Sequence, residues 1–342
     1  MLIGIVGPAC SGRHTVARLL VERDGFRLLT IRAPAGTVPG PVAPARIGSD
    51  DDDNNNAFAN AKQLLAYVTP RWRERFVTCD IASLDVLEQL RHRPFFVLLA
   101  VDAPTLIRYA RLTARHVQPK DQPSLEEFLR LDDQHCFGTP SITAALTQCA
   151  DIHVNNMYTN VDELYAHISC LRLTDPKRLR PSWDAYFMLL ADLAALRSNC
   201  MKRRVGCIIV RERRVVATGY NGTPRGIVNC NEGGCPRCNR GSACGTALDE
   251  CICLHAEENA LLEAGQERIQ GGNCTLYCNT CPCLGCAKRI VQMGISEVVF
   301  ARAYGSDSAT KTLFLTAGVH LRQYQPAGVR LETQSNDTLT PF

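Results

Sequence analysis

The sequence predicts an α/β protein built from two domains. Its 342 residues exceed the usual size of one domain. In each half, short apolar segments typical of buried strands alternate with segments that have helical spacing. A basic segment punctuated by prolines, residues 173–182, separates the two halves. We therefore expect domains at residues 1–172 and 182–326, joined by a linker at 173–181 and followed by a tail at 327–342.

The amino-terminal half begins with a short apolar strand at residues 1–7, a turn that contains glycine, and a helix at 14–25. A second buried strand is predicted at 93–104, and an arginine-bearing helix follows it at 105–116. Residues 33–56 are rich in proline and glycine and end in an acidic and amide tract. Such a composition predicts a flexible loop or insertion that cannot form a core.

The carboxyl-terminal half carries a longer and more regular series of elements. A helix comes first, then two strands that form a hairpin, and then a cysteine-rich loop at residues 229–253. After the loop, helices alternate with strands, and this order predicts a three-layer α/β unit with a mixed sheet. The predicted helices are 183–198, 255–265, 282–294 and 308–318, and the predicted strands are 205–210, 214–222, 274–278, 296–302 and 319–324.

The composition is that of an ordinary globular chain, with 46% hydrophobic and 21% charged residues. The formal net charge of +4 does not by itself indicate nucleic-acid binding, although it suits anionic small molecules. No apolar run reaches the ~18 residues needed to span a bilayer, and the amino terminus lacks the pattern of a signal peptide. We therefore expect a protein of the cytoplasm or nucleus with no membrane partner.

The 18 cysteines are unevenly distributed. Five are scattered over the first 199 residues, where they suit ordinary buried positions. The other thirteen lie between Cys200 and Cys286. In a chain of this size without an export signal, metal binding explains such a concentration better than disulfide bonds do.

Two short motifs place candidate metal ligands at the predicted starts of two helices. They are H-A-E at residues 255–257 and P-C-L-G-C at residues 282–286. His255, Cys283 and Cys286 would give a zinc ion three protein ligands and leave its fourth position for water, which is typical of a catalytic site. Helix N-termini also favour the thiolate form that a metal needs.

Glu257 lies two residues beyond the histidine and would carry protons between this water and a substrate. The alternative is a structural zinc site made only of the four cysteines in residues 278–286. That alternative leaves the H-x-E motif without a purpose, so we favour the catalytic site.

The pattern H-x-E…P-C-x-x-C is the signature of zinc-dependent nucleobase deaminases. Four longer segments, residues 199–210, 217–226, 253–265 and 275–300, together resemble the deoxycytidylate (dCMP) deaminases of fungal type. These enzymes form a branch of the cytidine deaminase superfamily. The resemblance covers roughly residues 182–325.

The resemblance implies a cytidine-deaminase-like fold and the hydrolytic conversion of dCMP to dUMP with release of ammonia. Water activated by zinc would attack C4 of cytosine, and Glu257 would deliver protons to N3 and to the leaving amine. Members of this family resemble one another in forming homo-oligomers, often hexamers. They are activated by dCTP and inhibited by dTTP, so the resemblance implies both as effectors.

The resemblance also indicates residues that would contact the substrate. Asn221 would bind the sugar and Tyr304 would line the base pocket, whereas Asn221 could instead be a turn residue that tolerates a positive φ. Basic residues such as Lys202, Arg203 or Arg204 would bind the phosphate, but a solvated surface is the ordinary explanation for such a cluster.

Some relatives carry a second, structural zinc, whose ligands correspond here to Cys200, Cys230 and Cys253. Their fourth ligand is a histidine, but the corresponding stretch here reads Cys244-Gly245. We expect at least one structural zinc, and Cys251 or the C-P-R-C pair could complete its site or form another. That pair consists of Cys235 and Cys238. In the family motif the residue before P-C-x-x-C can be Ser or Phe, and Cys278 belongs to the predicted strand, so Cys278 and Cys281 are expected not to be ligands.

The segment G-P-A-C-S-G-R-H-T near the amino terminus resembles the phosphate-binding loop of nucleotide kinases, G-x-x-x-x-G-K-[ST]. Gly7 and Gly12 have the required spacing, but Arg13 replaces the lysine and Thr15 comes one place late. Residues 97–115 are similar to the strand and lid region of small P-loop kinases. We expect a degenerate P-loop kinase-like domain with a regulatory or assembly role, in which backbone N–H groups could still bind a nucleotide.

Two other functions are compatible with the zinc motifs. A deaminase acting on a base in RNA or DNA would favour a wide basic surface with stacking aromatics, yet only 6% of the residues are aromatic. A non-catalytic zinc module could bind nucleic acid or a protein partner through residues 229–253. Glu257 distinguishes this last alternative, because a purely structural zinc site has no use for it.

Overall fold

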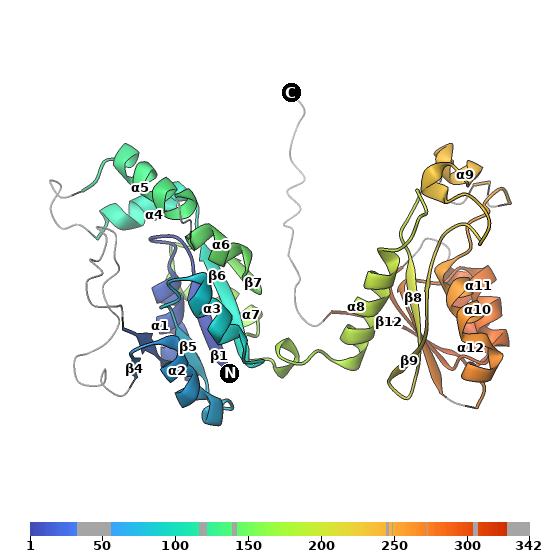
Figure 1. Cartoon of the computed structure of the whole chain (residues 1–342), viewed down its shortest axis with the longest axis horizontal. Helices are drawn as coiled ribbons and strands as arrows, with labels where there is room; N and C mark the ends of the chain where they lie inside the picture. The colour runs from blue at the N-terminus through green and yellow to red at the C-terminus, as the bar shows by residue number, and fades with distance from the viewer. Residues whose placement is uncertain are drawn as a thin grey trace. The chain divides into compact units, whose positions relative to one another are not determined.

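The computed structural model describes residues 1–32, 56–115, 122–138, 142–243, 246–247, 249–271, 273–303 and 307–326. Tyr304, Cys244, nearly all of the predicted insertion and the predicted tail lie outside these residues. The chain forms two compact units, Met1–Leu179 and Arg180–Phe342 (Figure 1). The division falls inside the expected linker, whose limits stay a prediction. Among the described helices, none combines the length and the apolar character needed to cross a membrane.

The amino-terminal unit is built on a sheet in which all paired strands are parallel, in the order β2-β5-β1-β6-β7. Its strands are β1 (Leu2–Val6), β2 (Arg27–Leu28), β5 (Phe76–Thr78), β6 (Phe96–Asp102) and β7 (Ile152–Asn155). A separate pair, β3 (Thr30–Ile31) and β4 (Ala57–Phe58), lies in a small sheet of its own. The central strand β1 is buried along its whole length, as expected of a parallel strand covered on both faces.

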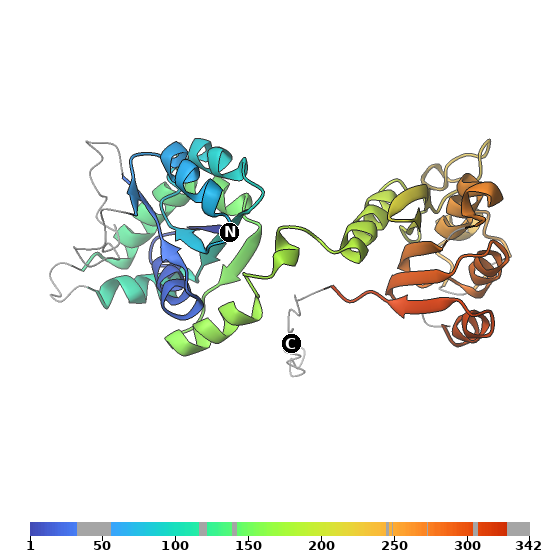
Figure 2. The same cartoon turned by 90° about the horizontal axis from the view of Figure 1, so that it is seen from below.

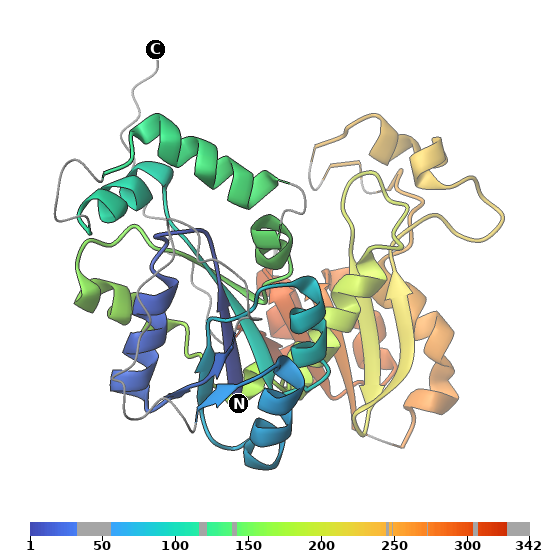
Figure 3. The same cartoon turned by 60° about the vertical axis from the view of Figure 1, so that its left-hand side comes forward.

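Helices cover both faces of this sheet, so the predicted α/β architecture is confirmed (Figure 3). Alternate residues of β1 face opposite ways: Ile3 and Ile5 pack with α1 and α7, whereas Leu2 and Val6 pack with α2, α3 and α6. The helices are α1 (Arg13–Asp24), α2 (Ala61–Val68), α3 (Leu84–Arg91), α4 (Thr105–Thr113), α5 (Leu125–Phe137), α6 (Ile142–Gln148) and α7 (Val161–Cys170), with 3-10 turns η1 (Thr69–Arg71) and η3 (Pro176–Arg178).

The carboxyl-terminal unit contains a mixed sheet in the order β12-β11-β10-β8-β9. The hairpin β8–β9 is antiparallel and β10 pairs antiparallel with β8, whereas β10, β11 and β12 run parallel. The strands are β8 (Gly206–Arg211), β9 (Arg214–Tyr220), β10 (Cys274–Thr280), β11 (Glu297–Arg302) and β12 (His320–Gln323). The predicted mixed sheet is therefore confirmed, including the order of its elements along the chain.

Helix α8 covers one face of this sheet, and α10, α11 and α12 cover the other (Figures 1 and 2). Ile208 and Val210 of β8 pack against α8, while Cys207 and Ile209 face the core shared with α10, α11 and α12. The helices are α8 (Trp183–Ala195), α10 (Ala256–Ile269), α11 (Leu284–Gln292) and α12 (Asp307–Thr316); the cysteine-rich segment adds η4 (Cys230–Glu232) and the short α9 (Pro236–Asn239).

The packing of α10 on β9 depends on a glycine in the G-Y-N-G segment. A Cβ placed on Gly219 would lie 2.1 Å from the Ala256 carbonyl oxygen and 2.5 Å from the Ala260 nitrogen. Both are backbone atoms of α10, which cannot move aside as a flexible side chain can. The absence of a side chain at Gly219 therefore sets how closely the first turn of α10 approaches the sheet.

We predict that Gly219→Ala destabilises the carboxyl-terminal unit, because the added methyl group pushes α10 away from β9. Overpacking of this kind costs about 1–3 kcal/mol. Denaturant unfolding of the zinc-loaded protein measures the loss. Thr218→Val is the matched control on the same strand, since Thr218 is exposed and surface substitutions usually change stability by less than about 0.5 kcal/mol. Equal stability of the two variants would contradict the close-approach argument.

Candidate active site and cysteine cluster

The two motifs that the sequence analysis singled out are at the starts of α10 and α11. His255 is the N-cap of α10, with extended backbone at φ −77° and ψ 158°. Its N–H donates to Oε2 of Glu258 at 2.9 Å, a contact typical of a capping box. Cys283 is the N-cap of α11. Pro282 therefore comes one residue before the cap, not in the first helical turn as the sequence suggested.

The structure brings His255, Cys283 and Cys286 to one point. Nδ1 of His255 lies 3.5 Å from Sγ of Cys283 and 3.3 Å from Sγ of Cys286. A tetrahedral zinc with Zn–N and Zn–S bonds of about 2.0 and 2.3 Å separates nitrogen from sulfur by about 3.5 Å. The three side chains therefore fit a zinc ion, with one position left for a further ligand.

The electrostatic surroundings suit a metal site with a proton carrier beside it. Glu257 is only 4% exposed, and its burial raises the pKa of the carboxyl group to about 7. A proton carrier works best when its pKa is near the working pH, because both protonation states are then populated. The hydrogen bond from the Cys286 thiol, followed by that from His255, lowers the pKa of Cys283 to about 3, which favours the thiolate.

The two remaining cysteines of residues 278–286 lie apart from this group. Cys278 is fully buried in β10 and packs in the core below α10 and α11. Cys281 follows β10, and its backbone N–H donates to the Arg302 carbonyl oxygen at 2.9 Å. Among the described residues, the metal-compatible group near α10 contains one histidine and two cysteines rather than four cysteines.

Asn221 is buried and holds its own loop together. Its Oδ1 accepts from the Ser198 hydroxyl at 2.7 Å and from the Val205 N–H at 2.8 Å. Its Nδ2 donates to the Arg203 carbonyl oxygen at 2.8 Å. Its φ is not positive, so the alternative of a turn residue in the left-handed region is wrong. The side chain ties residues 198–205 to the G-Y-N-G segment.

The basic residues proposed for the phosphate have different surroundings. The Lys202 ammonium group donates to the carbonyl oxygens of Ser242 and Ala243, so it stabilises the cysteine-rich segment. Arg203 and Arg204 are exposed. Tyr304, the expected wall of the base pocket, falls outside the described residues.

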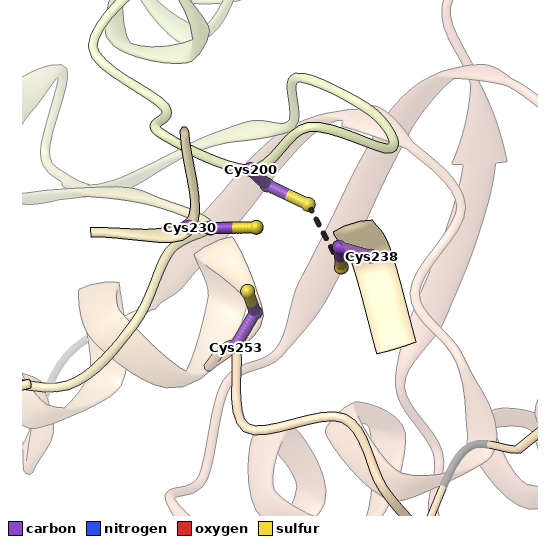
Figure 4. Close-up of side chains that lie close together, drawn as sticks. All are labelled: Cys200, Cys230, Cys238 and Cys253. Carbon is purple, nitrogen blue, oxygen red and sulfur yellow. Dashed lines mark hydrogen bonds between the residues drawn. The ribbon is translucent and has the colours of Figure 1, made fainter. Parts of the chain in front are cut away.

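A second group of sulfur atoms belongs to cysteines that precede His255 in the sequence. Cys200, Cys230, Cys238 and Cys253 point toward one another from four different segments (Figure 4), and their sulfur atoms all lie within 4.8 Å of one another. Cys238 takes the place of the histidine expected from some relatives. The fourth member therefore comes from the C-P-R-C pair, one of the two sources that the sequence left open.

Comparison with known proteins agrees with this geometry. Residues 181–302 match the family model described as the cytidine and deoxycytidylate deaminase zinc-binding region. A deoxycytidylate deaminase of Schizosaccharomyces pombe is 47% identical over 328 residues, which cover 95% of this chain and 97% of that protein. The chain belongs to the deoxycytidylate deaminase family. The family predicted from the sequence is thereby confirmed.

Two further comparisons extend the picture of this family. A deoxycytidylate deaminase of Saccharomyces cerevisiae is 42% identical over 337 residues, covering 95% of this chain and 96% of that protein. The match to the fungal deaminases therefore includes both units of the chain. Among solved structures, the dCMP deaminase of cyanophage S-TIM5 in complex with dCMP and dUMP is 29% identical, with a TM-score of 0.35 over 42% of this chain and 98% of that one.

In the amino-terminal unit, the phosphate-loop-like segment connects β1 to α1. Gly7 and Gly12 adopt φ values of 152° and 99°, which favour glycine. A Cβ on Gly7 would lie 2.0 Å from the Val101 carbonyl oxygen of the neighbouring strand. Arg13 and Thr15 both lie in the first turn of α1.

Arginine side chains bind the carbonyl groups of this loop. Nη1 of Arg13 donates to the Gly7 carbonyl oxygen at 3.1 Å. Nη1 of Arg111, from α4, donates to the carbonyl oxygens of Cys10 and Ser11 at 3.3 and 3.1 Å. The loop is thus held in shape by two guanidinium groups of the protein itself.

A pair of residues that was not predicted from the sequence joins the two helices whose N-termini carry the site. Oε1 of Glu258 forms an ion pair with Nη2 of Arg289 at 3.0 Å, joining α10 to α11. The same carboxylate caps His255 through its other oxygen. A glutamate three residues after a helix start is a capping-box signal, so the pattern H-A-E-E could have indicated this role.

We predict that Glu257→Gln lowers the turnover number by at least ~10²-fold, the usual contribution of a general acid or base, while zinc content stays the same. Glutamine keeps the shape of the side chain but cannot carry a proton. Ammonia release and metal analysis of the same preparation measure both quantities. Glu263→Gln on the same helix is the control, because Glu263 is exposed. Turnover close to that of the parent would favour a non-catalytic zinc module.

Proposed function

We propose that this protein catalyses the hydrolytic deamination of dCMP to dUMP and ammonia, which supplies dUMP for thymidylate synthesis. The observation that carries the chemistry is the convergence of His255, Cys283 and Cys286 beside the buried Glu257. Support for the substrate comes from the fungal deoxycytidylate deaminases, which match 95% of the chain.

The protein's own residues have distinct parts in this reaction. His255, Cys283 and Cys286 would hold the zinc, which as a Lewis acid lowers the pKa of water and makes it nucleophilic at neutral pH. Glu257 takes up one proton of the attacking water and delivers it to N3 of the base, and then moves the second, from the hydroxyl group formed on C4, to the departing amine. The net reaction exchanges the C4 amino group for an oxygen and releases one ammonia.

Recognition of the sugar and phosphate rests on the segments beside this site. Asn221 has its Oδ1 and one hydrogen of its Nδ2 committed within the loop, so only the second Nδ2 hydrogen would donate to the sugar. Arg203 or Arg204 is proposed to bind the phosphate because both side chains are exposed, and the Lys202 ammonium group donates to two backbone carbonyl oxygens. Tyr304 is retained as the proposed wall of the base pocket.

The amino-terminal unit is proposed to be a degenerate P-loop kinase-like domain. Its all-parallel sheet, with a glycine-bearing loop between β1 and α1, supports this proposal. Phosphate loops use a lysine for the β- and γ-phosphates and a hydroxyl for magnesium, but Arg13 and His14 occupy those places. Arg13 also folds back onto Gly7. A regulatory role, with dCTP as activator and dTTP as inhibitor of the enzyme, suits this loop better than phosphoryl transfer.

The chain is proposed to form homo-oligomers, such as the hexamers that the family resemblance implies. The exposed face of α8 is the proposed interface. Leu189, Leu193 and Leu196 follow one another at spacings of four and three residues and are 61%, 61% and 62% exposed. Residues so spaced lie on one face of a helix. A contiguous apolar surface of this kind marks a protein interface, and a second copy of the chain is the occupant we propose.

We predict that dCMP is the preferred substrate, with kcat/KM about 10- to 100-fold above that for deoxycytidine, the range expected for hydrogen bonds to one charged group. Ammonia release is measured with dCMP, CMP, deoxycytidine and oligonucleotides. The expected rate rises with dCTP and falls with dTTP, and added ATP produces no ADP. Activity on oligonucleotides without activity on dCMP would contradict the proposed substrate.

We predict that the double variant Leu189→Glu/Leu193→Glu lowers the molecular mass in solution, because two charges cannot be buried unpaired in an apolar interface. Light scattering after size-exclusion chromatography measures the mass. Leu315→Glu is the control, since Leu315 is 82% exposed on α12 and outside the proposed interface. An unchanged mass for the double variant, or a monomeric parent, would exclude the α8 face as the interface.

A further inference from the structure

One buried cluster of the carboxyl-terminal unit is made only of cysteines. Four of its side chains are fully or nearly fully buried and two partly buried ones pack against them, and none of the described residues in the cluster is aliphatic or aromatic. Six thiols provide little apolar surface, so this cluster is a poor hydrophobic core. Its members are Cys200, Cys230, Cys235, Cys238, Cys251 and Cys253.

The sulfurs of this cluster form two overlapping sets of four. The first set is Cys200, Cys230, Cys238 and Cys253, and in the second Cys235 and Cys251 replace the first two. In each set the four sulfur atoms lie within 4.8 Å of one another. The sulfurs of Cys200 and Cys238 are 3.8 Å apart, which is the separation of about 3.8 Å expected for a tetrahedral zinc with Zn–S bonds of about 2.3 Å.

We propose that these six cysteines hold two zinc ions in a binuclear cluster, with Cys238 and Cys253 bridging the metals. Cys200 and Cys230 would be the terminal ligands of one ion, and Cys235 and Cys251 those of the other. Six cysteines sharing two zinc ions occur in other protein modules. This inference goes beyond a single structural zinc and does not depend on the proposed substrate.

Two ions explain the cluster better than one. If a single zinc ion occupied the first set, the thiols of Cys235 and Cys251 would bind no metal. Yet both lie within 4.8 Å of the shared sulfur atoms of Cys238 and Cys253. A second ion uses both of them. Two zinc ions with six thiolates carry the same net charge, about −2, as one zinc ion with four thiolates. The larger cluster therefore adds no uncompensated charge.

The surroundings of the cluster suit an anion. Arg237 lies between Cys235 and Cys238 in the sequence and is only 6% exposed. It hydrogen-bonds to Cys251, and its Nε donates to the Thr246 carbonyl oxygen at 2.8 Å. None of the ion pairs found in the described part of the chain involves Arg237. A buried guanidinium needs a compensating negative charge, and the zinc–thiolate cluster would supply it.

Hydrogen bonds to the sulfur atoms give a second indication. The backbone N–H of Met201 donates to Sγ of Cys230 at 3.4 Å, and Nδ2 of Asn239 approaches the same sulfur at 3.9 Å. N–H groups aimed at ligand atoms orient metal ligands and are typical of the shell around a metal site. They also stabilise thiolates over thiols.

The cluster would fix the position of the chain segments that lead into the catalytic site. Cys253 is separated from His255 only by Leu254, which exchanges two backbone hydrogen bonds with Gly222, at 2.8 and 3.2 Å. Cys200 follows Ser198, whose hydroxyl binds Asn221. The cluster therefore anchors both the chain that delivers the histidine ligand and the loop that carries Asn221.

Metal analysis of the full-length protein, purified under reducing conditions, tests the proposal. We expect three zinc ions per chain, one for each metal-compatible group. His255→Ala should retain two, and Cys235→Ser/Cys251→Ser should also retain two by losing only the second cluster ion. Cys149→Ser/Cys170→Ser, in the amino-terminal unit, is the control and should retain three. Two zinc ions in the parent, or three in Cys235→Ser/Cys251→Ser, would overturn the proposal.

X-ray absorption at the zinc edge keeps the test decisive if the cysteine variant fails to fold. In His255→Ala, where only cluster zinc is expected, we predict zinc surrounded by four sulfurs and a short zinc–zinc vector. Zinc with four sulfurs but no zinc–zinc vector would indicate a mononuclear site and overturn the bridging arrangement. In the parent protein, an intact zinc–zinc vector without any dCMP turnover would count against the proposed function alone.

Discussion

The carboxyl-terminal unit depends on the meeting of two helix N-termini at one point. His255 and Cys283 are both N-caps, so their side chains leave the chain where backbone N–H groups are unsatisfied and the helix dipole is positive. The carboxylate of Glu258 accepts a hydrogen bond from the N-cap residue of α10 and forms an ion pair with Arg289 of α11. The close approach of α10 to the sheet at Gly219 sets the distance between the N-terminus of α10 and strand β9. A zinc site with nitrogen and two sulfurs follows from this arrangement.

The cysteine-rich segment is organised by a different force. Its longest helix in the described residues, α9, has four residues, too few for a stable helix without outside support. The cysteine cluster contains no aliphatic side chain in the part of the segment that the structure describes, so burial of apolar surface contributes little to holding it. Metal–thiolate bonds can hold it, because metal binding to such small elements provides folding free energy directly.

Short motifs with fixed spacing could be interpreted from the sequence alone. His255, Cys283 and Cys286 were predicted as one group because two helix starts with metal-binding side chains suggest a shared point, and the structure brings them together. The mixed sheet was predictable because strands such as β8 and β10 have five or more residues of clear pattern. In the amino-terminal unit, β2 and β7 have two and four residues, too few for any period to show.

Features created by tertiary contacts could not be predicted. The choice of Cys238 over Cys235 or Cys251 as partner of Cys200 depends on how four segments pack, and no local pattern encodes it. The role of Asn221 was expected to be recognition or turn formation. Its hydrogen bonds to Ser198 and Val205 also make it a link between two segments, which only the folded chain reveals.

The two kinds of metal site are coupled through Leu254. This residue is held to Gly222, with a proposed cluster ligand immediately before it and a proposed catalytic ligand immediately after it. Displacement of Cys253 would therefore move His255 as well, because Leu254, the single residue between them, is held to Gly222 and cannot compensate for the shift. Coupling between binding sites is reciprocal, so zinc at the catalytic centre would in turn favour the cysteine cluster. The histidine that the reaction needs is thus positioned from both sides, by the capped helix that follows it and by the sulfurs that precede it.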